Sequence, residues 1–297
     1  MKSKKKLIYI ADFSLPNMSA YMLHVLKMCD AMSEKKFNVT LFIPFVKKGY
    51  SFNYFKSKYL LKTNFTIESF FNKPIKRGFF SYLLFAIKIL IFIKKKNNLL
   101  IISRSIIPAL VLSLTNYNVL LEIHTEMRGL TKAIFKIIVF FNFDQKLKYI
   151  LIHKKLNEKL QLHKKKFIVL DDCVDIRDFK KNVSVKNECV YTGSYVDGKG
   201  LNVILNIAKR LPDVKFNLYG NIRTIKKELK SLIIRQKNIK LNNYITYNKI
   251  PDIIKSNKVL LMPYEEKINV LIKNLDVSNY ISPLKLFDYL ASGSTII

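Results

Sequence analysis

Short apolar runs, many of them β-branched, alternate with amphipathic helical stretches along this chain, and this alternation restricts its fold more than any other feature. In the first half the apolar runs cover residues 7–11, 38–44, 98–103, 119–124, 149–153 and 167–172. Strands that are apolar throughout are typical of parallel sheets, because helices cover both faces of such a sheet. The pattern therefore predicts an α/β domain with a parallel sheet.

The alternation lapses once and then restarts, which divides the chain into two parts. Residues 177–188 are polar and charged, and we interpret them as a linker. Beyond them, apolar runs cover 189–193, 214–220 and 258–264, and helical stretches cover 200–211, 223–235 and 283–291. We predict two Rossmann-like domains, 1–176 and 189–297, which face a crevice between the carboxyl ends of their strands, where such folds bind ligands.

Length and composition agree with this division. The 297 residues are enough for two domains of roughly 100–200 residues each. Hydrophobic residues make up 49% of the chain and charged residues 25%, which is typical of globular proteins and excludes a disordered chain.

Basic residues dominate the charge balance. The 52 Lys and Arg residues against 21 Asp and Glu residues give a formal net charge of +31. Such a charge attracts a nucleic acid, an anionic membrane or a phosphorylated substrate. A bias toward AT-rich codons, which encode Lys, Asn and Ile, explains the same excess without any partner. The sequence has no recognised nucleic-acid motif and no aromatic-interleaved basic groove, so we expect no nucleic-acid partner.

The cysteines and the most apolar segment bear on localisation. Cys29, Cys173 and Cys189 form no close pair, and no signal peptide is recognisable, which predicts a cytoplasmic protein. The segment Phe79–Ile93 contains Lys88 and is shorter than the ~20 residues that span a bilayer. We expect a helix there, either in the core or in peripheral contact with the inner face of an anionic membrane.

The second part opens with "YTGSYVDGKGLNVIL", which predicts a strand, a glycine-bearing loop and a helix. This arrangement exposes backbone N–H groups to an anion. Gly193, Gly198 and Gly200 allow tight turns, and Lys199 supplies a positive charge for a phosphate. The loop departs from that of nucleoside triphosphatases, which need Ser or Thr where Gly200 stands. The alternative interpretation is an ordinary turn with a solvated lysine.

A second stretch, "NYISPLKLFDYLASG", predicts another anion site. Ser282 is a suitable N-cap and Pro283 a suitable first helical residue, so the free amides of the first turn, with Lys285, would hold a phosphate. Asp288 follows on the same helical face and would accept hydrogen bonds from ribose hydroxyls. The alternative is that Lys285 and Asp288 form a surface ion pair.

These two stretches, with "KVLLMPYEE" between them, resemble in order and spacing the donor half of glycosyltransferase family 4, which has the two-domain GT-B architecture. The first half is similar to the family's opening loop, helix and second strand over "LPNMSAYMLHVLKMCDAMSEKKFNVTLFIP". The stretches "IISRS", "LLEIHT" and "VLDDCVDIRDF" stand where the later strand ends and the domain crossing fall. The resemblance covers essentially the whole chain.

The resemblance implies retaining transfer from a nucleoside-diphosphate sugar to a saccharide or lipid-linked acceptor in cell-envelope polysaccharide synthesis, without a cofactor or an obligatory metal. It implies that His124 is a catalytic residue near the transferred sugar, the alternative being a structural histidine at a strand end. The acceptor would lie near Asn17, Arg104 and Glu122. The donor would contact Gly193, Ser194, Lys199, Ser282, Pro283, Leu284, Lys285 and Asp288.

The sequence departs from the family pattern in several places. The family's first acid falls on Tyr280, and its second is Asp288 rather than Glu. Ser194 replaces a basic residue, and the opening loop has Asn17–Ala20 in place of glycines. We interpret Lys285 as the replacement for the missing charge.

The family continues beyond "GSTII", where this sequence ends, so we expect the second domain to be incomplete. At ~25 cal/mol per Å² of apolar area, a few hundred Å² left uncovered would forfeit several kcal/mol, comparable to the stability of a whole domain. We therefore expect poor solubility or partial unfolding in the second half and weak catalysis. The alternative function is an inactive sugar-nucleotide-binding fragment of such an enzyme.

Overall fold

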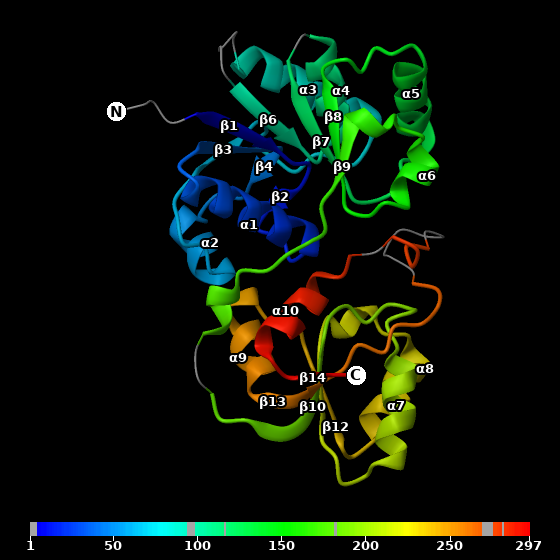
Figure 1. Cartoon of the computed structure of the whole chain (residues 1–297). Coiled ribbons are helices and arrows are strands. Elements are labelled where there is room, and N and C mark those ends of the chain that lie inside the picture. The colour runs from blue at the N-terminus through cyan, green and yellow to red at the C-terminus, as the bar shows by residue number, and fades with distance from the viewer. Residues whose placement is uncertain (1–4, 94–98, 116, 181–182, 269–275, 281) are drawn as a thin grey trace. The chain divides into compact units, whose positions relative to one another are not determined.

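The computed structural model describes residues 5–93, 99–115, 117–180, 183–268, 276–280 and 282–297. The chain forms two compact units, Met1–Asp171 and Asp172–Ile297, and each has helices packed on a parallel sheet (Figure 1). The boundary precedes the predicted end of the first domain at residue 176. The reason is that Phe179, inside the predicted linker 177–188, packs in the second unit against Val190 and Tyr289. Residues 181 and 182 of that linker lie outside the described residues.

The sheet of the first unit has seven parallel strands in the part of the chain that the structure describes. In spatial order they are β5 (Thr66–Ser69), β3 (Asn38–Ile43), β1 (Lys6–Ile10), β6 (Leu99–Ser103), β7 (Val119–Ile123), β8 (Leu147–Leu151) and β9 (Phe167–Val169). A separate short pair joins β2 (Ser14–Leu15) to β4 (Phe45–Val46). Residue 98, the first of the predicted strand 98–103, lies outside the described residues.

The helices of this unit are α1 (Ala20–Glu34), α2 (Phe52–Tyr59), α3 (Phe79–Ile93), α4 (Ile106–Leu114), α5 (Gly129–Phe140), α6 (Leu156–Leu160) and the 3-10 turn η1 (Lys164–Lys166). Helix α1 begins after Ser19, whose side chain accepts a hydrogen bond from the Met22 amide. In the sequence, Met22, Val25, Leu26, Cys29 and Met32 recur at helical spacing, which predicts a core face there and puts Lys27 and Asp30 on the other side. In the structure, Met22, Val25, Leu26 and Cys29 are buried.

The predicted helix at Phe79–Ile93 is α3, and it is both a core helix and an exposed one. Phe85, Ala86 and Ile89 are fully buried, whereas Phe80 is 79% and Ile91 68% exposed. No helix in the described part of the chain is long and apolar enough to cross a bilayer.

The second unit has, among its described residues, five parallel strands. Their spatial order is β12 (Ile239–Asn242), β11 (Phe216–Tyr219), β10 (Lys186–Thr192), β13 (Asn257–Leu260) and β14 (Thr295–Ile296). The helices are α7 (Leu201–Arg210), α8 (Lys227–Arg235), α9 (Ile250–Lys255) and α10 (Leu284–Ser292), with 3-10 turns η2 (Ile176–Phe179), η3 (Ile222–Thr224) and η4 (Tyr247–Lys249).

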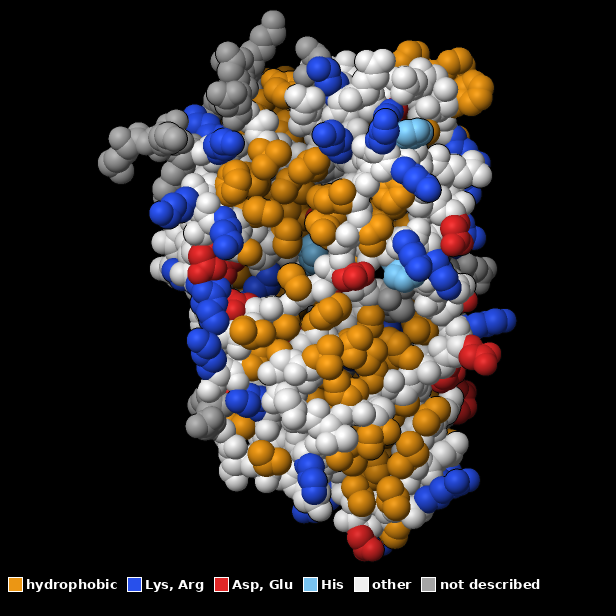
Figure 2. All heavy atoms as spheres, viewed as in Figure 1, with side chains coloured by type: hydrophobic (Ala, Val, Ile, Leu, Met, Phe, Trp, Pro, Cys, Tyr) orange, Lys and Arg blue, Asp and Glu red, His pale blue; other side chains and the backbone are white. Residues whose placement is uncertain are grey.

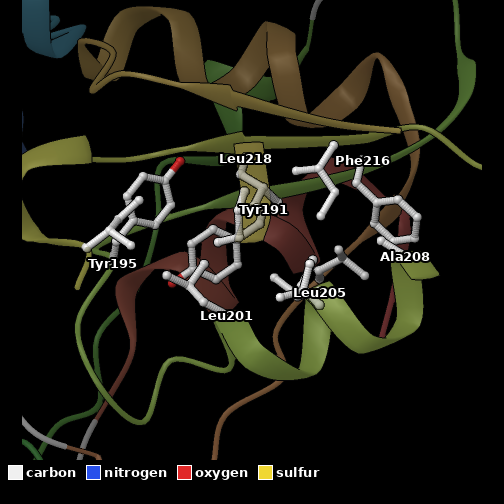
Figure 3. Packing of buried hydrophobic residues seen from close by; sticks show 12 residues of the cluster. Tyr191, Tyr195, Leu201, Leu205, Ala208, Phe216 and Leu218 are labelled. Carbon is white, nitrogen blue, oxygen red and sulfur yellow. The ribbon is translucent and has the colours of Figure 1, made fainter. Parts of the chain in front are cut away.

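Apolar side chains pack on both faces of this second sheet. On one face, Leu201, Leu205 and Ala208 of α7 point toward Tyr191 of β10 and Phe216 and Leu218 of β11 (Figure 3). On the other, Ile254 of α9 and Tyr289 of α10 pack with Val190 and Leu260. Such sheets bind ligands where the strand order reverses, at the carboxyl ends of the strands. These points lie between β1 and β6 in the first unit and between β10 and β13 in the second.

Candidate functional site

At the carboxyl end of β10 the chain enters a loop that only glycines can form. Gly193 has φ +152° and Gly200 has φ +76°, values that residues with a side chain rarely adopt. A Cβ at Gly200 would lie 1.8 Å from the carbonyl oxygen of Pro263, so the loop packs directly against the segment after β13. This contact brings Lys199, two residues before α7, to the switch point of the second sheet.

Two lysines converge there on tyrosine rings. Lys199 Nζ lies 4.0 Å from the centroid of the Tyr264 ring, and Lys285 Nζ lies 4.0 Å from the Tyr191 ring and 4.6 Å from the Tyr264 ring. A Cβ at Gly193 would lie 3.5 Å from Lys285 Nζ, so the ammonium group lies against the loop that follows β10. The structure therefore brings Gly193, Lys199 and Lys285 together.

Neither ammonium group is neutralised. Among the described residues no carboxylate lies within salt-bridge distance of Lys199 or Lys285, and Lys285 Nζ is buried without a hydrogen-bond partner. Burial lowers the pKa of Lys199 to about 8. Burial and, secondarily, the charge of Lys199 hold the pKa of Lys285 well below its usual range. Burying unpaired cations costs several kcal/mol each, so an anion in contact with these ammonium groups would be stabilised.

The start of α10 differs from the prediction in its cap. The helix begins at Leu284 with Pro283 as the N-cap, and the Ser282 hydroxyl oxygen instead accepts a hydrogen bond from the Asp172 amide at 3.3 Å. The expectation that Ser282 caps this helix is therefore wrong. The amides of Leu284 and Lys285 still open the helix without intrahelical partners, as first-turn amides do.

Asp288 lies one turn after Lys285 and is buried, accepting a hydrogen bond from the Tyr247 hydroxyl at 3.2 Å. The surface ion pair between Lys285 and Asp288 is excluded, because the Lys285 ammonium is buried away from any described carboxylate. Ser194 is exposed and offers its carbonyl to the Tyr191 hydroxyl at 2.8 Å. The rings of Tyr191 and Tyr264, which the sequence did not indicate, contact the two lysine ammonium groups.

In the first unit a buried carboxylate gathers side chains from four elements. Glu122 of β7 contacts the Tyr9 hydroxyl of β1 and the ring of His124, and its Oε1 lies 2.8 Å from His24 Nε2 of α1. Arg104, which follows β6, places its Nε 3.9 Å from the same oxygen. The cluster occupies the carboxyl ends of the strands beside the switch point of this sheet. It unites the predicted residues Arg104, Glu122 and His124 and adds Tyr9 and His24.

Asn17 is placed elsewhere. Its side-chain oxygen accepts a hydrogen bond from the Ser19 amide at 2.8 Å, and its carbonyl accepts one from the Tyr59 hydroxyl at 2.8 Å. Asn17 thus shapes the entry to α1, and no hydrogen bond between described residues joins it to Glu122 or Arg104.

Arg104 also packs on the ring of Tyr21, whose hydroxyl binds a second carboxylate, Asp12. Its guanidinium carbon lies 4.3 Å from the centroid of the Tyr21 ring, and the Tyr21 hydroxyl donates to Asp12 at 2.7 Å. Arg104 Nη1 is buried without a hydrogen-bond partner among the described residues. A buried donor without a partner is costly, so this nitrogen is available to an acceptor group on a ligand.

The protonation states in this cluster follow from its contacts. Burial by itself raises the pKa of Glu122, but the hydrogen bonds to His124 and His24 and the charge of Arg104 outweigh it and hold the pKa well below its usual range. Burial lowers the pKa of His124. His24, Glu122 and His124 also have metal-ligand atoms within 4.8 Å of one another. The guanidinium of Arg104 beside the same oxygen disfavours a dication there.

We expect Glu122→Ala to destabilise the first unit by roughly 3–5 kcal/mol, because it leaves Tyr9, both histidines and Arg104 buried without their shared acceptor. Denaturant unfolding followed by tyrosine fluorescence measures this. Glu126→Ala is the control, since the one ion pair of Glu126 with a described residue is a surface pair with Lys159 at 3.9 Å, and such pairs contribute about 0–1 kcal/mol. Equal stability of the two variants would contradict the role given to Glu122.

No family model and no curated protein matches the sequence. Solved structures match the fold. A glycosyltransferase from Rickettsia africae ESF-5 is 13% identical with a TM-score of 0.72, over 99% of this chain and 78% of that one. Sucrose-phosphate synthase from Thermosynechococcus elongatus is 9% identical with a TM-score of 0.68, over 99% and 80%. WaaG, a glycosyltransferase involved in lipopolysaccharide biosynthesis, is 9% identical with a TM-score of 0.60, over 98% and 80%. With its two parallel Rossmann-like sheets, the chain has the GT-B glycosyltransferase fold.

Proposed function

We propose that this chain is a glycosyltransferase that takes a sugar from a nucleoside-diphosphate donor and passes it to a saccharide or lipid-linked acceptor in cell-envelope polysaccharide synthesis. One observation carries the proposal. Two buried ammonium groups, those of Lys199 and Lys285, lie on the same tyrosine ring without a described carboxylate. They lie at the switch point of a sheet whose fold is shared with glycosyltransferases. A diphosphate carries the complementary charge.

The proposed roles follow from position. Lys199 and Lys285 hold the diphosphate, together with the loop at Gly193 and Ser194 and the opening of α10 at Ser282, Pro283 and Leu284. Asp288 accepts hydrogen bonds from the ribose. In the first unit, His124 contacts the transferred sugar, and Arg104, Glu122 and Asn17 lie on the acceptor side.

The chemistry of these residues suits departure of a diphosphate. As the glycosidic bond breaks, negative charge builds on the leaving phosphate oxygen, and two preorganised ammonium groups in a water-poor pocket stabilise it. The lysines supply the charge that a divalent metal would otherwise supply, so we propose a reaction without a metal or cofactor. Retention of the anomeric configuration is a further part of the proposal, taken from the family resemblance.

A thermal-shift screen of nucleoside diphosphates and their sugars tests the proposal, because a ligand that binds only the native protein raises its melting temperature. We expect a diphosphate or its sugar to stabilise the protein while the corresponding nucleoside does not. Transfer of the sugar to an acceptor extract is then measured with the best donor. Binding without transfer would favour the inactive sugar-nucleotide-binding alternative, and no stabilisation by any diphosphate would contradict both.

The proposal also includes peripheral contact with a membrane. The C-terminal end of α5 and the turn after it expose Ile137, Phe140, Phe141 and Phe143, with Phe140 82% exposed. Figure 2 shows apolar side chains gathered over the α5 end of the first unit, with lysine or arginine side chains beside them. An apolar patch rimmed by lysines on a chain of net charge +31 suits an anionic bilayer.

We expect the protein to co-sediment with vesicles that contain anionic lipid, and less so as salt screens the charges. Replacing Phe140 and Phe143 with Ser should lower the vesicle partition coefficient by roughly a hundredfold or more, because burial of each of the two aromatic side chains contributes about 1.5–3 kcal/mol. The paired control replaces Leu232 and Ile234, which are exposed on α8 of the second unit. If equal amounts of protein sediment with neutral and anionic vesicles, codon bias and not a membrane accounts for the excess of basic residues.

A further inference from the structure

Tyr264 lies where three separate elements of the second unit meet. It follows β13, and its ring faces Lys199 from the loop before α7 and Lys285 from α10. Its hydroxyl makes no hydrogen bond to a described residue, and burial raises its pKa above the ordinary value for tyrosine. The side chain therefore meets the two lysines with an uncharged ring.

The ring offsets a specific electrostatic cost. Two ammonium groups that approach one point repel each other, and neither has a carboxylate among the described residues. Other titratable groups nearby are the phenols of Tyr191, Tyr195 and Tyr289, whose pKa values burial also raises, and the carboxylate of Asp288, which accepts a hydrogen bond from the Tyr247 hydroxyl. The negative face of an aromatic ring attracts a cation, more strongly where water is excluded. The Tyr264 ring thus attracts both ammonium groups, which offsets their mutual repulsion and keeps both lysines in place.

We infer that Tyr264 is a positioning residue of the diphosphate site: its ring contacts both the Lys199 and the Lys285 ammonium groups and fixes their positions, so that a diphosphate meets two cations that are already in place. The inference rests on the proposed function for the identity of the ligand. The role of the Tyr264 ring itself does not depend on which nucleotide is bound. Tyr191 supports Lys285 from the other side through its ring at 4.0 Å. Its hydroxyl also holds Ser194, so Tyr191 is the less informative position to change.

The experiment compares Tyr264→Phe with Tyr264→Leu, using inorganic pyrophosphate as the probe in calorimetric titrations from pH 6.5 to 9. Phenylalanine keeps the ring, so we expect unchanged affinity. Leucine keeps bulk but removes the attraction for both cations, so we expect roughly tenfold weaker binding, since cation–π contacts of about 0.5–2 kcal/mol are lost. The loss of affinity with rising pH should also begin at lower pH in Tyr264→Leu, because the charged forms of both lysines lose stabilisation.

Tyr54→Leu is the matched control, because Tyr54 is a half-exposed tyrosine whose ring contacts Lys58 at 5.9 Å in the first unit. It should leave pyrophosphate binding and its pH profile unchanged. The inference is overturned if the parent chain binds no pyrophosphate, if Tyr264→Leu binds as the parent does, or if Tyr264→Phe is impaired equally. The proposed function fails separately: if pyrophosphate binding follows the expected pattern but no nucleotide sugar is bound or used, the positioning role stands and the glycosyltransferase assignment falls.

Discussion

Replacing Lys285 with Met is expected to raise the melting temperature of the protein while it weakens binding of the nucleoside diphosphate. A buried cation without a carboxylate destabilises the fold, and a methionine of similar shape removes that cost. We expect a gain of roughly 1–3 kcal/mol, or about 3 °C or more. Affinity should fall roughly 10- to 150-fold, the effect of losing a charged hydrogen bond worth about 1.5–3 kcal/mol.

A variant that gains stability but loses affinity shows that the lysine serves binding, because replacing a structural lysine would lower the stability. Lys199→Met should behave similarly, since Lys199 is also buried without a described carboxylate. Lys209→Met, on the exposed face of α7, is the control and should change neither quantity. If Lys285→Met melts at a lower temperature and binds the diphosphate as the parent does, Lys285 serves packing and the site is misassigned.

Affinity for the nucleotide sugar should fall as the pH rises above about 8. The pKa of Lys199 is about 8 because burial lowers it, and the diphosphate requires the ammonium form. Above that pH the protein must take up a proton to bind, which weakens binding by up to about tenfold per pH unit. The two phosphates of a nucleotide sugar are both esterified and keep their charge over this range. Calorimetric titrations from pH 7 to 9.5 measure the trend.

The free energy of unfolding should instead rise as the pH rises above about 8. The folded pKa of Lys199, about 8, lies below the unfolded value, so between them the unfolded chain binds more protons and folding gains free energy as the pH rises. The Lys199→Met variant should lack this contribution in both measurements. Affinity that is independent of pH from 7 to 9.5 in the parent would contradict a role for a lysine whose pKa burial has lowered.

The strand and helix alternation was sufficient to predict both sheets, because core strands are buried on both faces and so read as apolar runs. It missed β5 and β12, the edge strands Thr66–Ser69 and Ile239–Asn242. An edge strand pairs on one side only and tolerates polar residues such as Glu68 and Lys240. Asp30, which the helical spacing of α1 assigned to the solvent side, is buried and accepts hydrogen bonds from the Lys62 and Thr63 amides.

The candidate sites were predictable only where their residues lie close together in sequence. Lys199 and Lys285 each follow a recognisable turn, so the sequence indicated them one at a time. Their meeting at Tyr264 depends on how β10, β13 and α10 pack, and a tyrosine after a strand carries no signal of such a role. His24 likewise sits on an ordinary amphipathic helix, and only the β1–β6–β7 order brings it to Glu122.

The central claim is that one diphosphate bridges Lys199 and Lys285 at the start of α10. A crystal structure of the protein with the nucleoside diphosphate that stabilises it most tests this claim directly. We predict phosphate oxygens about 2.7–2.9 Å from Nζ of both lysines, the usual length for a charged hydrogen bond, with both ammonium groups still in contact with the Tyr264 ring. Phosphates bound at other residues, out of hydrogen-bond reach of both Nζ atoms, would contradict it.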